Sequence, residues 1–312
     1  MKILITGGAG YIGSTLCEFL LDKGHEVTVV DTFLFSNNSL NSYMSNKKFK
    51  VFQEDVRNIN SLKKFIQNSD IIIPLACLVG APLCNLKESE AIDVNFNSIK
   101  NLVNHLSKDQ YIIYPTTNSG YGIGEKDKFC TEETPLNPIS IYGKTKVNAE
   151  NYIADNFNNS TRLRLATVFG CSPRMRLDLL VNDFVYRATK DKFIVLFESN
   201  FKRNYIHIRD VCRAIIMCIE NYEKFSGETF NLGISDANLS KLELCKLIKK
   251  HLPKFEILES DIGKDIDKRD YIVSNKKIES LGFKPQYSVD DGVSELIKLF
   301  EYLIPSETMR NF

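Results

Sequence analysis

The chain has 312 residues and a formal net charge of +1, with 43% of its residues hydrophobic and 25% charged. This balance excludes a strong electrostatic attraction to nucleic acid or a membrane surface, and the longest apolar runs fall well short of the roughly 20 residues that cross a bilayer. No leader stands before the first apolar run, and the eight cysteines and four histidines form no CxxC pair or ligand cluster, so we expect a cytoplasmic protein with neither disulfides nor a metal site.

The first predicted strand, 2–6, runs directly into a glycine cluster. Residues 7–13 read GGAGYIG, which fits G-x-G-x-x-G and precedes a helical pattern. Glycine loses more conformational freedom on folding than any other residue, so the cluster needs a reason. Between a strand and a helix, such glycines let a pyrophosphate approach the backbone and the helix N-terminus. The candidate dinucleotide-binding residues are Gly7, Gly10, Tyr11, Ile12 and Gly13.

The second predicted strand, 26–30, is followed by Asp31. A carboxylate here accepts hydrogen bonds from an adenosine ribose and repels a 2′-phosphate, so together with the glycine cluster it predicts NAD rather than NADP. The alternative is a purely structural glycine turn. Asp55 and Val56, after the third strand, are candidates for the adenine, although an isolated Asp is more often a helix cap.

The rest of the first two-thirds alternates short, continuously apolar runs with amphipathic stretches. Continuous apolar strands that are each followed by a helix are typical of a parallel sheet covered on both faces. We therefore expect an α/β protein with a Rossmann-type, doubly wound parallel sheet. The later predicted strands are 50–53, 70–76, 111–117 and 161–169, and the longer helices are 91–106 and 141–157.

A Tyr-x-x-x-Lys pattern places both side chains on one helix face, where the ammonium favours the tyrosinate and prepares the phenol as a base. Only Tyr142 follows a sheet strand by a loop, so it can face the carboxyl end of the sheet, where ligands bind. That strand ends in Thr116 and Thr117, whose hydroxyls can hold a substrate oxygen. The alternative is that Tyr142 and Lys146 are only neighbouring side chains on the surface of a helix. The pattern occurs three times, at Tyr142/Lys146, Tyr43/Lys47 and Tyr186/Lys190.

Beyond residue 170 the pattern loosens into short strands, helical stretches and charged linkers. We interpret residues 171–312 as mainly a smaller C-terminal α/β lobe for the substrate. The first domain, 1–170, is expected to interleave with later segments near 203–232 rather than to end cleanly.

In these motifs and their order the chain resembles the extended short-chain dehydrogenases/reductases that act on nucleotide sugars, the NAD-dependent epimerase/dehydratase family. The resemblance covers nearly the whole chain and implies NAD as the cofactor, with Leu75, Ala76 and Asn95 as further members of its site. It is carried by TGGAGYIG, Asp31, DV at 55–56, PLA at 74–76, VNFNSIKNL, TTNSGYG, YGKTK and RNYIHIRDV.

The resemblance also implies catalytic roles. Tyr142 corresponds to the base, Lys146 to the group that tunes its pKa and holds the nicotinamide ribose, and Thr117 to their hydroxyl partner. Arg203 corresponds to an arginine that binds the diphosphate of the nucleotide sugar, a task that suits a planar guanidinium; its alternative is a surface arginine. The further substrate-binding candidates in the later lobe and at the strand ends are Val79, Gly80, Asn118, Thr167, Arg174, Arg176 and Arg269.

Two departures from the family narrow the expected reaction. Its 4,6-dehydratases carry Thr-Asp-Glu where this chain has Thr-Asn-Ser at 117–119, so dehydration is disfavoured. Its UDP-galactose-type 4-epimerases usually carry Asn where this chain has Thr167. Residues 79–84 and 169–184 resemble the bacterial sugar-epimerase branch, in particular GDP-manno-heptose 4-dehydrogenases of capsule pathways.

We therefore expect NAD-dependent oxidation at C4 of a nucleotide-diphosphate sugar. The favoured substrate is GDP-D-glycero-D-manno-heptose, converted to its 4-keto sugar in capsule polysaccharide biosynthesis. The alternatives are a nucleotide-sugar 4-epimerase of the UDP-glucose/galactose type, a 4-ketoreductase and, least favoured, a non-catalytic NAD-binding sensor. A 2-keto acid is a candidate hydride acceptor. Helices near 98–106 and 141–157 resemble those that pair in this family, so a homodimer is expected, with no nucleic-acid or membrane partner.

Overall fold

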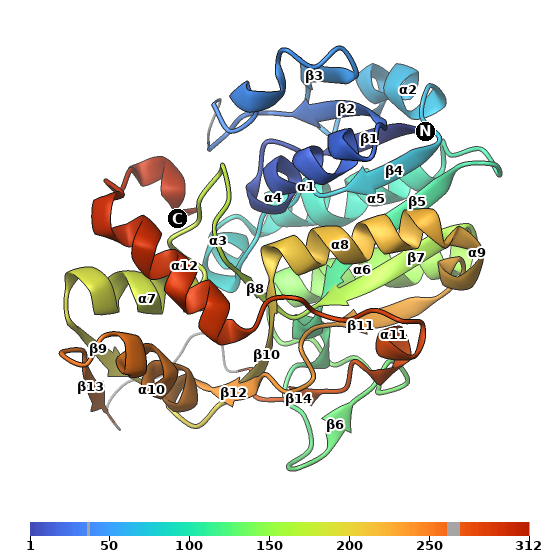
Figure 1. Ribbon diagram of the computed structural model, residues 1–312. Helices are drawn as coiled ribbons and strands as arrows, with labels where there is room; N and C mark the ends of the chain where they lie inside the picture. The colour runs from blue at the N-terminus through green and yellow to red at the C-terminus, as the bar shows by residue number, and fades with distance from the viewer. Residues whose placement is uncertain (36–37, 261–268, 312) are drawn as a thin grey trace.

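The computed structural model describes residues 1–35, 38–260 and 269–311. At its centre is a parallel sheet of seven strands (Figure 1). The chain builds this sheet outward from its first strand, first to one side and then to the other. Across the sheet the order is β11 (Thr229–Leu232), β7 (Ser160–Leu165), β5 (Tyr111–Thr117), β4 (Ile71–Pro74), β1 (Lys2–Thr6), β2 (Glu26–Asp31) and β3 (Phe49–Gln53).

Helices cover both faces of this sheet, which confirms the expected Rossmann-type fold. Ile3 and Ile5 of β1 face one apolar core and Leu4 faces the other, as the alternation of a strand requires. The first core is completed by α1 (Tyr11–Asp22), α8 (Ile208–Glu220), α9 (Tyr222–Phe225) and α11 (Lys276–Ser280). The second is completed by α2 (Ile59–Gln67), α3 (Ala81–Leu86), α4 (Glu88–Ile92), α5 (Ser98–Val103) and α6 (Ile141–Asn156).

Two predicted elements differ from the structure. The segment 161–169, expected as one strand, divides after β7, and its last part forms β8 (Thr167–Phe169) in a separate sheet. The expected helix 91–106 is interrupted by a π-helical turn, η2 (Asp93–Asn97), between α4 and α5. Such turns inside helices are frequent at functional sites.

The smaller lobe packs three helices and two small sheets around its own core. Its helices are α7 (Leu180–Lys190), α10 (Lys241–His251) and α12 (Val289–Tyr302). Its strands are β8 with β10 (Lys202–His207) and β12 (Asn238–Ser240), and β9 (Phe193–Leu196) with β13 (Glu256–Glu259). The remaining elements are β6 (Phe129–Cys130) paired with β14 (Ile272–Val273), and the short turns η1 (Asn41–Tyr43), η3 (Asn118–Tyr121) and η4 (Glu307–Met309).

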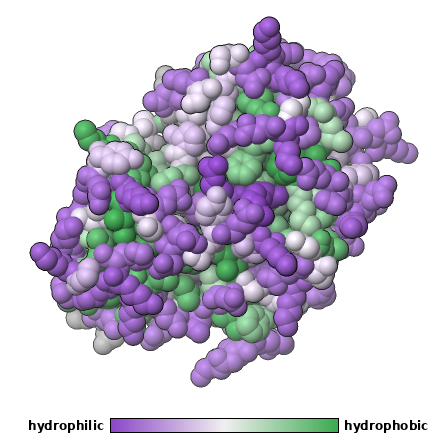
Figure 2. Space-filling model, in the orientation of Figure 1, coloured by the Kyte–Doolittle hydropathy of each residue, from purple (hydrophilic) through white to green (hydrophobic). Residues whose placement is uncertain are grey.

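Segments of the two lobes alternate along the chain. β11 joins the central sheet and α8 packs on it, although both follow residue 170. The face of the molecule in Figure 2 is mostly hydrophilic, with hydrophobic side chains in small separate groups. None of the helices in the described part of the chain is long and apolar enough to cross a membrane. Within the same residues, no three potential metal ligands gather.

Candidate active site

A cavity of about 540 Å³ opens at the carboxyl ends of the central strands. The strand order reverses between β1 and β4, and this reversal is where open α/β sheets bind their ligands. The cavity extends from the glycine cluster after β1, past Tyr142 on α6, to arginines of the smaller lobe.

The glycine cluster has the shape that a dinucleotide needs. Gly7 has a φ of +72°, and a Cβ there would lie 2.4 Å from the backbone nitrogen of Ala76. A Cβ on Gly13 would lie 2.6 Å from Cα of Gly8. Gly10 caps α1 without a side chain, so the N–H groups of the first turn stay open to an anion. Gly7, Gly10, Tyr11, Ile12 and Gly13 all line the cavity.

The carboxylate of Asp31 lies at the edge of this cradle. Its Oδ2 accepts a hydrogen bond from the Ala9 N–H at 2.9 Å, and its Oδ1 accepts one from the Phe33 N–H at 2.8 Å. Each oxygen keeps a further lone pair for a ribose hydroxyl. Burial raises the pKa of Asp31, although these backbone donors oppose the shift. The glycine cradle and Asp31 together fit NAD.

The adenine candidates Asp55 and Val56 also line the cavity. Asp55 forms a hydrogen-bonded ion pair with Arg57, which holds the pKa of its carboxyl below the usual range. Val56 is buried. Asp55 therefore acts in part as a local partner for Arg57, and Val56 offers an apolar contact.

Tyr142 and Thr117 meet where α6 begins beside the end of β5. The Ser140 side chain caps α6 by accepting a hydrogen bond from the Gly143 N–H at 3.1 Å, which places Tyr142 in the first turn. Thr117 is the last residue of β5. Burial and the Cys77 thiol raise the pKa of the Tyr142 phenol, whereas Arg269 and a hydrogen bond with Thr117 lower it.

Lys146 lies one turn further along α6 and is buried. Its Nζ donates to the Pro115 carbonyl at 2.7 Å and lies 4.0 Å from the centroid of the Tyr114 ring. Burial lowers the pKa of its ammonium. Thr117, Tyr142 and Lys146 all line the cavity, so the structure brings the expected catalytic set together.

Asn95 supports this set from behind rather than from within the cavity. Its Oδ1 accepts from the Leu78 N–H at 2.8 Å, and its Nδ2 donates to the Leu78 carbonyl at 3.0 Å and to the Thr145 hydroxyl at 3.2 Å. The π-helical turn aims Asn95 at these partners. It does not line the cavity, whereas Leu75 and Ala76 do, and its contact with the cofactor stays a prediction.

Arg174, Arg176, Arg203 and Arg269 bring positive charge to the cavity from the smaller lobe. Arg176 is paired with Asp178, at 3.0 Å for Nε and 2.5 Å for Nη2. Arg174 donates from Nη2 to Oδ1 of Asn311 at 2.7 Å, and its Nε has no hydrogen-bond partner among the described residues. Burial lowers the pKa of Arg174 to about 10. A bound anion would offset this loss of solvation.

The remaining substrate candidates divide into two groups. Val79, Gly80 and Thr167 line the cavity. Asn118 does not: its amide is buried outside the lining, and neither amide atom has a hydrogen-bond partner among the described residues. Asn118 is the first residue of η3, directly after Thr117, and its contact with the substrate stays a prediction.

Sequence reasoning missed three residues of this site. Cys77 lines the cavity beside Tyr142, and its position just after the PLA motif was the available signal. Asn311 reaches the cavity through Arg174, which no local pattern indicates. Ser119 contacts Thr117, and only its closeness to that strand end pointed to it.

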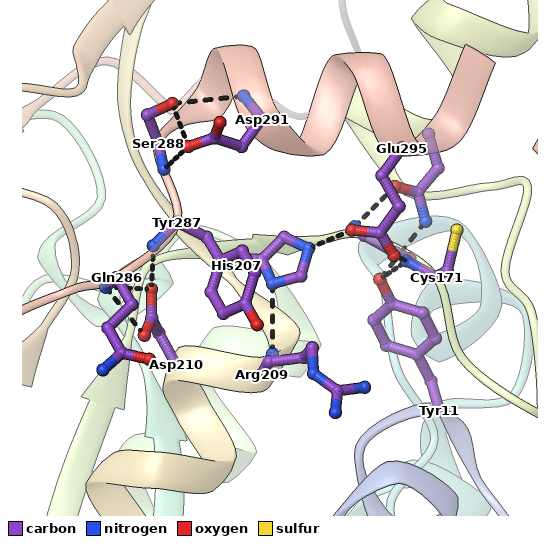
Figure 3. Close-up of polar contacts among 12 residues, drawn as sticks. Tyr11, Cys171, His207, Arg209, Asp210, Gln286, Tyr287, Ser288, Asp291 and Glu295 are labelled. Carbon is purple, nitrogen blue, oxygen red and sulfur yellow. Dashed lines mark hydrogen bonds and ion pairs between the residues drawn. The ribbon is translucent and has the colours of Figure 1, made fainter. Parts of the chain in front are cut away.

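A polar network ties the glycine cluster to the smaller lobe (Figure 3). The Tyr11 hydroxyl donates to the Gly170 carbonyl at 2.7 Å. The next residue, Cys171, donates its N–H to Glu295 of α12 at 3.0 Å. The other oxygen of Glu295 lies 2.8 Å from Nε2 of His207. The segment after β8 thus links the cofactor cradle to α12.

His207 has a defined tautomer in this network. Its Nδ1 accepts the Arg209 N–H at 3.3 Å at the start of α8 (Figure 3), so its Nε2 carries the proton that Glu295 accepts. The ring stacks on Tyr287, with centroids 4.5 Å apart. This side chain is fully buried and serves the junction between the lobes.

The chain is similar in sequence and in fold to several known proteins. The model of the NAD dependent epimerase/dehydratase family matches residues 3–233. The uncharacterized UDP-glucose epimerase YtcB of Bacillus subtilis is 28% identical over 325 residues, covering 98% of this chain and 100% of that protein. CDP-paratose 2-epimerase of Salmonella typhi is 27% identical over 331 residues, covering 95% and 98%. UDP-glucuronic acid 4-epimerase from Bacillus cereus, solved with UDP-glucuronic acid and NAD, has a TM-score of 0.83 at 26% identity and covers 96% of this chain and 99% of that structure.

Proposed function

The chain belongs to the NAD dependent epimerase/dehydratase family, and from this premise we propose that it oxidises the C4 hydroxyl of a nucleotide-diphosphate sugar. It is an NAD-dependent enzyme of the short-chain dehydrogenase/reductase type that acts on nucleotide sugars. The observation that carries the proposal is the shared cavity, where Tyr142, Thr117 and Lys146 lie beside the glycine cradle and Asp31.

The residues of the cavity divide the task. The backbone of the glycine cradle binds the pyrophosphate of the cofactor, and Asp31 accepts the hydroxyls of the adenosine ribose. Bound NAD⁺ supplies the acceptor for the hydride that leaves C4. Tyr142, as tyrosinate, takes the proton of the C4 hydroxyl, so the C–O bond becomes a carbonyl. Thr117 holds the same oxygen, and Lys146 favours the tyrosinate by its charge.

The arginines of the smaller lobe suit the diphosphate of the substrate. Arg203 and Arg269 line the cavity on the side of the smaller lobe, and a guanidinium binds phosphate oxygens by paired hydrogen bonds. Arg174 lies closer to the cofactor side, because its backbone N–H contacts Ser14 of α1 at 3.3 Å and Asp31 is near its guanidinium.

A nucleotide-sugar 4-epimerase is the second candidate. Relatives are named as 4-epimerases of UDP-glucose and UDP-glucuronic acid, which favours return of the hydride to the opposite face of C4. The GDP-linked manno-heptose, the capsule pathway and the 2-keto acid acceptor stay predictions that rest on residues 79–84 and 169–184. We also propose a homodimer through α5 and α6.

The test separates release of a ketone from epimerisation. UDP-glucose, UDP-glucuronic acid and a GDP-linked heptose are each incubated with the NAD-loaded enzyme in deuterated water, with and without a 2-keto acid. A 4-ketone with label at C3 and C5 supports the dehydrogenase, and a C4 epimer without free ketone supports the epimerase. If none of these nucleotide sugars reduces the cofactor or changes at C4, the proposal fails.

A further inference from the structure

A chain of hydrogen bonds runs from Tyr142 through Thr117 and Ser119 to Arg269, and Ser119 has no role in the proposal above. The Thr117 hydroxyl, which is hydrogen bonded to the Tyr142 phenol, donates to Oγ of Ser119 at 2.9 Å. The Ser119 N–H donates back to Oγ1 of Thr117 at 3.1 Å. Nη1 of Arg269 donates to Oγ of Ser119 and completes the chain.

The number of hydroxyl protons determines which residue donates in each of these hydrogen bonds. Thr117 has one hydroxyl proton, which goes to Ser119, so a neutral Tyr142 donates to Thr117. Once Tyr142 is ionised, the Thr117 hydroxyl can rotate and donate to the phenolate, and the Ser119 hydroxyl can rotate and donate to Thr117. Arg269 donates to Ser119 in both states. After ionisation every donor of the chain therefore points toward Tyr142.

The surroundings make this contact strong. Ser119 is 2% exposed and Thr117 is 8% exposed, so the chain lies largely out of water. Hydrogen bonds that end on a charged donor are stronger than neutral ones, and low dielectric strengthens them further. Arg269 also lines the cavity, so its guanidinium faces both Ser119 and the space beside Tyr142.

Three neutral acids around Tyr142 oppose its ionisation. These are the thiol of Cys77 in the segment after β4, the thiol of Cys84 in α3 and the phenol of Tyr114 in β5. Lys146, on the same helix, is hydrogen bonded to the Pro115 carbonyl rather than to the phenol. Among the described residues, the guanidinium of Arg269 is the charge from another element that favours the tyrosinate.

We propose that Ser119 and Arg269 are positioning residues for the base: Ser119 orients the Thr117 hydroxyl, and Arg269, acting through Ser119 and by its charge, stabilises the ionised Tyr142. This inference rests on the proposed function, because it takes Tyr142 as the base. Ser119 has a different role from the acid or base that a dehydratase needs. Its uncharged hydroxyl orients the Thr117 hydroxyl.

The test measures the pH dependence of hydride transfer in single turnovers of the NAD-loaded enzyme with a nucleotide sugar that the wild type oxidises. Arg269→Met is expected to shift the acidic limb of the pH–rate profile to higher pH by about one unit. Arg269→Lys keeps the charge and is expected to return the limb most of the way to its wild-type position. Ser119→Ala is expected to shift the acidic limb in the same direction by a smaller amount. Ser119→Thr keeps a hydroxyl and is expected to leave the limb at its wild-type position. Arg176→Met is the matched control, because Arg176 lines the same cavity but contacts Asp178; a change in KM without movement of the limb is expected.

A second readout does not need turnover. Tyrosine labelled with a carbon isotope at Cζ is followed by NMR in the NAD⁺ complex, and the Tyr142 signal is assigned by its loss in Tyr142→Phe. Its titration is expected at higher pH in Arg269→Met than in the wild type. Equal titration in both proteins, or an Arg269→Met variant that raises KM alone, overturns the inference. Failure of the proposed function is seen separately, as absence of cofactor reduction by wild-type enzyme.

Discussion

The ammonium of Lys146 donates a hydrogen bond to the carbonyl oxygen of Pro115 at 2.7 Å, which ties α6 to the end of β5. This bond fixes the helix that carries Tyr142 against the strand that carries Thr117. Lys146→Met removes both the tie and the charge, so turnover and cofactor affinity are expected to fall together. Lys144→Met is the matched control, since Lys144 is exposed on the same helix. Steady-state kinetics and NAD titration measure both effects; an effect of Lys144→Met as large as that of Lys146→Met would contradict this role.

Tyr142→Phe is expected to lose about 10²–10⁴-fold in turnover, the usual contribution of a positioned base, while NAD affinity is kept. Tyr186→Phe is the control: the ring of Tyr186 packs on Phe300 in the smaller lobe, with centroids 5.5 Å apart. It belongs to a second Tyr-x-x-x-Lys pattern far from the cradle. If Tyr186→Phe were the damaging change in a turnover assay, the active site would be misplaced.

Asp31 is expected to make the protein prefer NAD(H) strongly over NADP(H), because its carboxylate would face a 2′-phosphate. Asp31→Asn keeps an acceptor for the ribose but removes the repulsion, so it is expected to narrow the ratio of the two affinities. Titration of both cofactors by calorimetry gives this ratio. Equal binding of NADP by the wild type would show that Asp31 does not face the ribose.

Gly7→Ala is expected to destabilise the protein and to abolish NAD binding, because the new Cβ would lie 2.4 Å from the Ala76 nitrogen. Gly24→Ala is the matched control. Gly24 has a similar φ of +80°, but its Cβ would lie 3.6 Å from Nζ of Lys48, so only the backbone strain remains, about 1–2 kcal/mol. Urea unfolding compares the two variants. Equal losses would mean that conformation alone, and not the contact with Ala76, requires glycine at residue 7.

The contact between Glu295 and His207 predicts a pH-dependent stability. Burial would raise the pKa of Glu295, but hydrogen bonds from His207 and Cys171 outweigh it and hold the pKa below its usual value. A carboxyl with a lowered folded pKa stabilises the fold fully above its unfolded pKa of about 4.3, and this contribution is lost as the pH falls through the folded pKa. Glu295→Gln is therefore expected to flatten the acidic decline of the free energy of unfolding, measured in urea at several pH values. If the free energy of unfolding declined at acidic pH as steeply in Glu295→Gln as in the wild type, other carboxyl groups would be responsible for the decline.

The sequence predicted the parts of the protein that local patterns encode. The alternation of apolar strands and helices indicated the doubly wound sheet, because each strand buried on both faces must read as a continuous apolar run. The position of Tyr142 after a sheet strand separated it from Tyr43 and Tyr186. The structure places Tyr43 beside α1, where its hydroxyl donates to the Ser14 carbonyl at 2.9 Å.

Contacts between distant segments could not be predicted in this way. Arg269 and Ser119 are 150 residues apart, and Arg174 and Asn311 are 137 apart. Nothing in either local sequence specifies these partners, since tertiary packing brings them together. The division of 161–169 into β7 and β8 was hidden for a related reason: the segment TRLRLATVF contains no glycine or proline to show that its two ends join different sheets.

The return of the chain end to the cofactor cavity matters for anyone who prepares this protein. Met309 accepts a hydrogen bond from the Leu177 N–H at 2.8 Å, and Asn311 holds Arg174. A purification tag or fluorescent fusion joined at that end would begin next to the cavity and compete with these contacts. The N-terminus lies well away from the C-terminus in Figure 1, and Met1 is 62% exposed. Fusion at the N-terminus is therefore the design that leaves the cofactor site undisturbed.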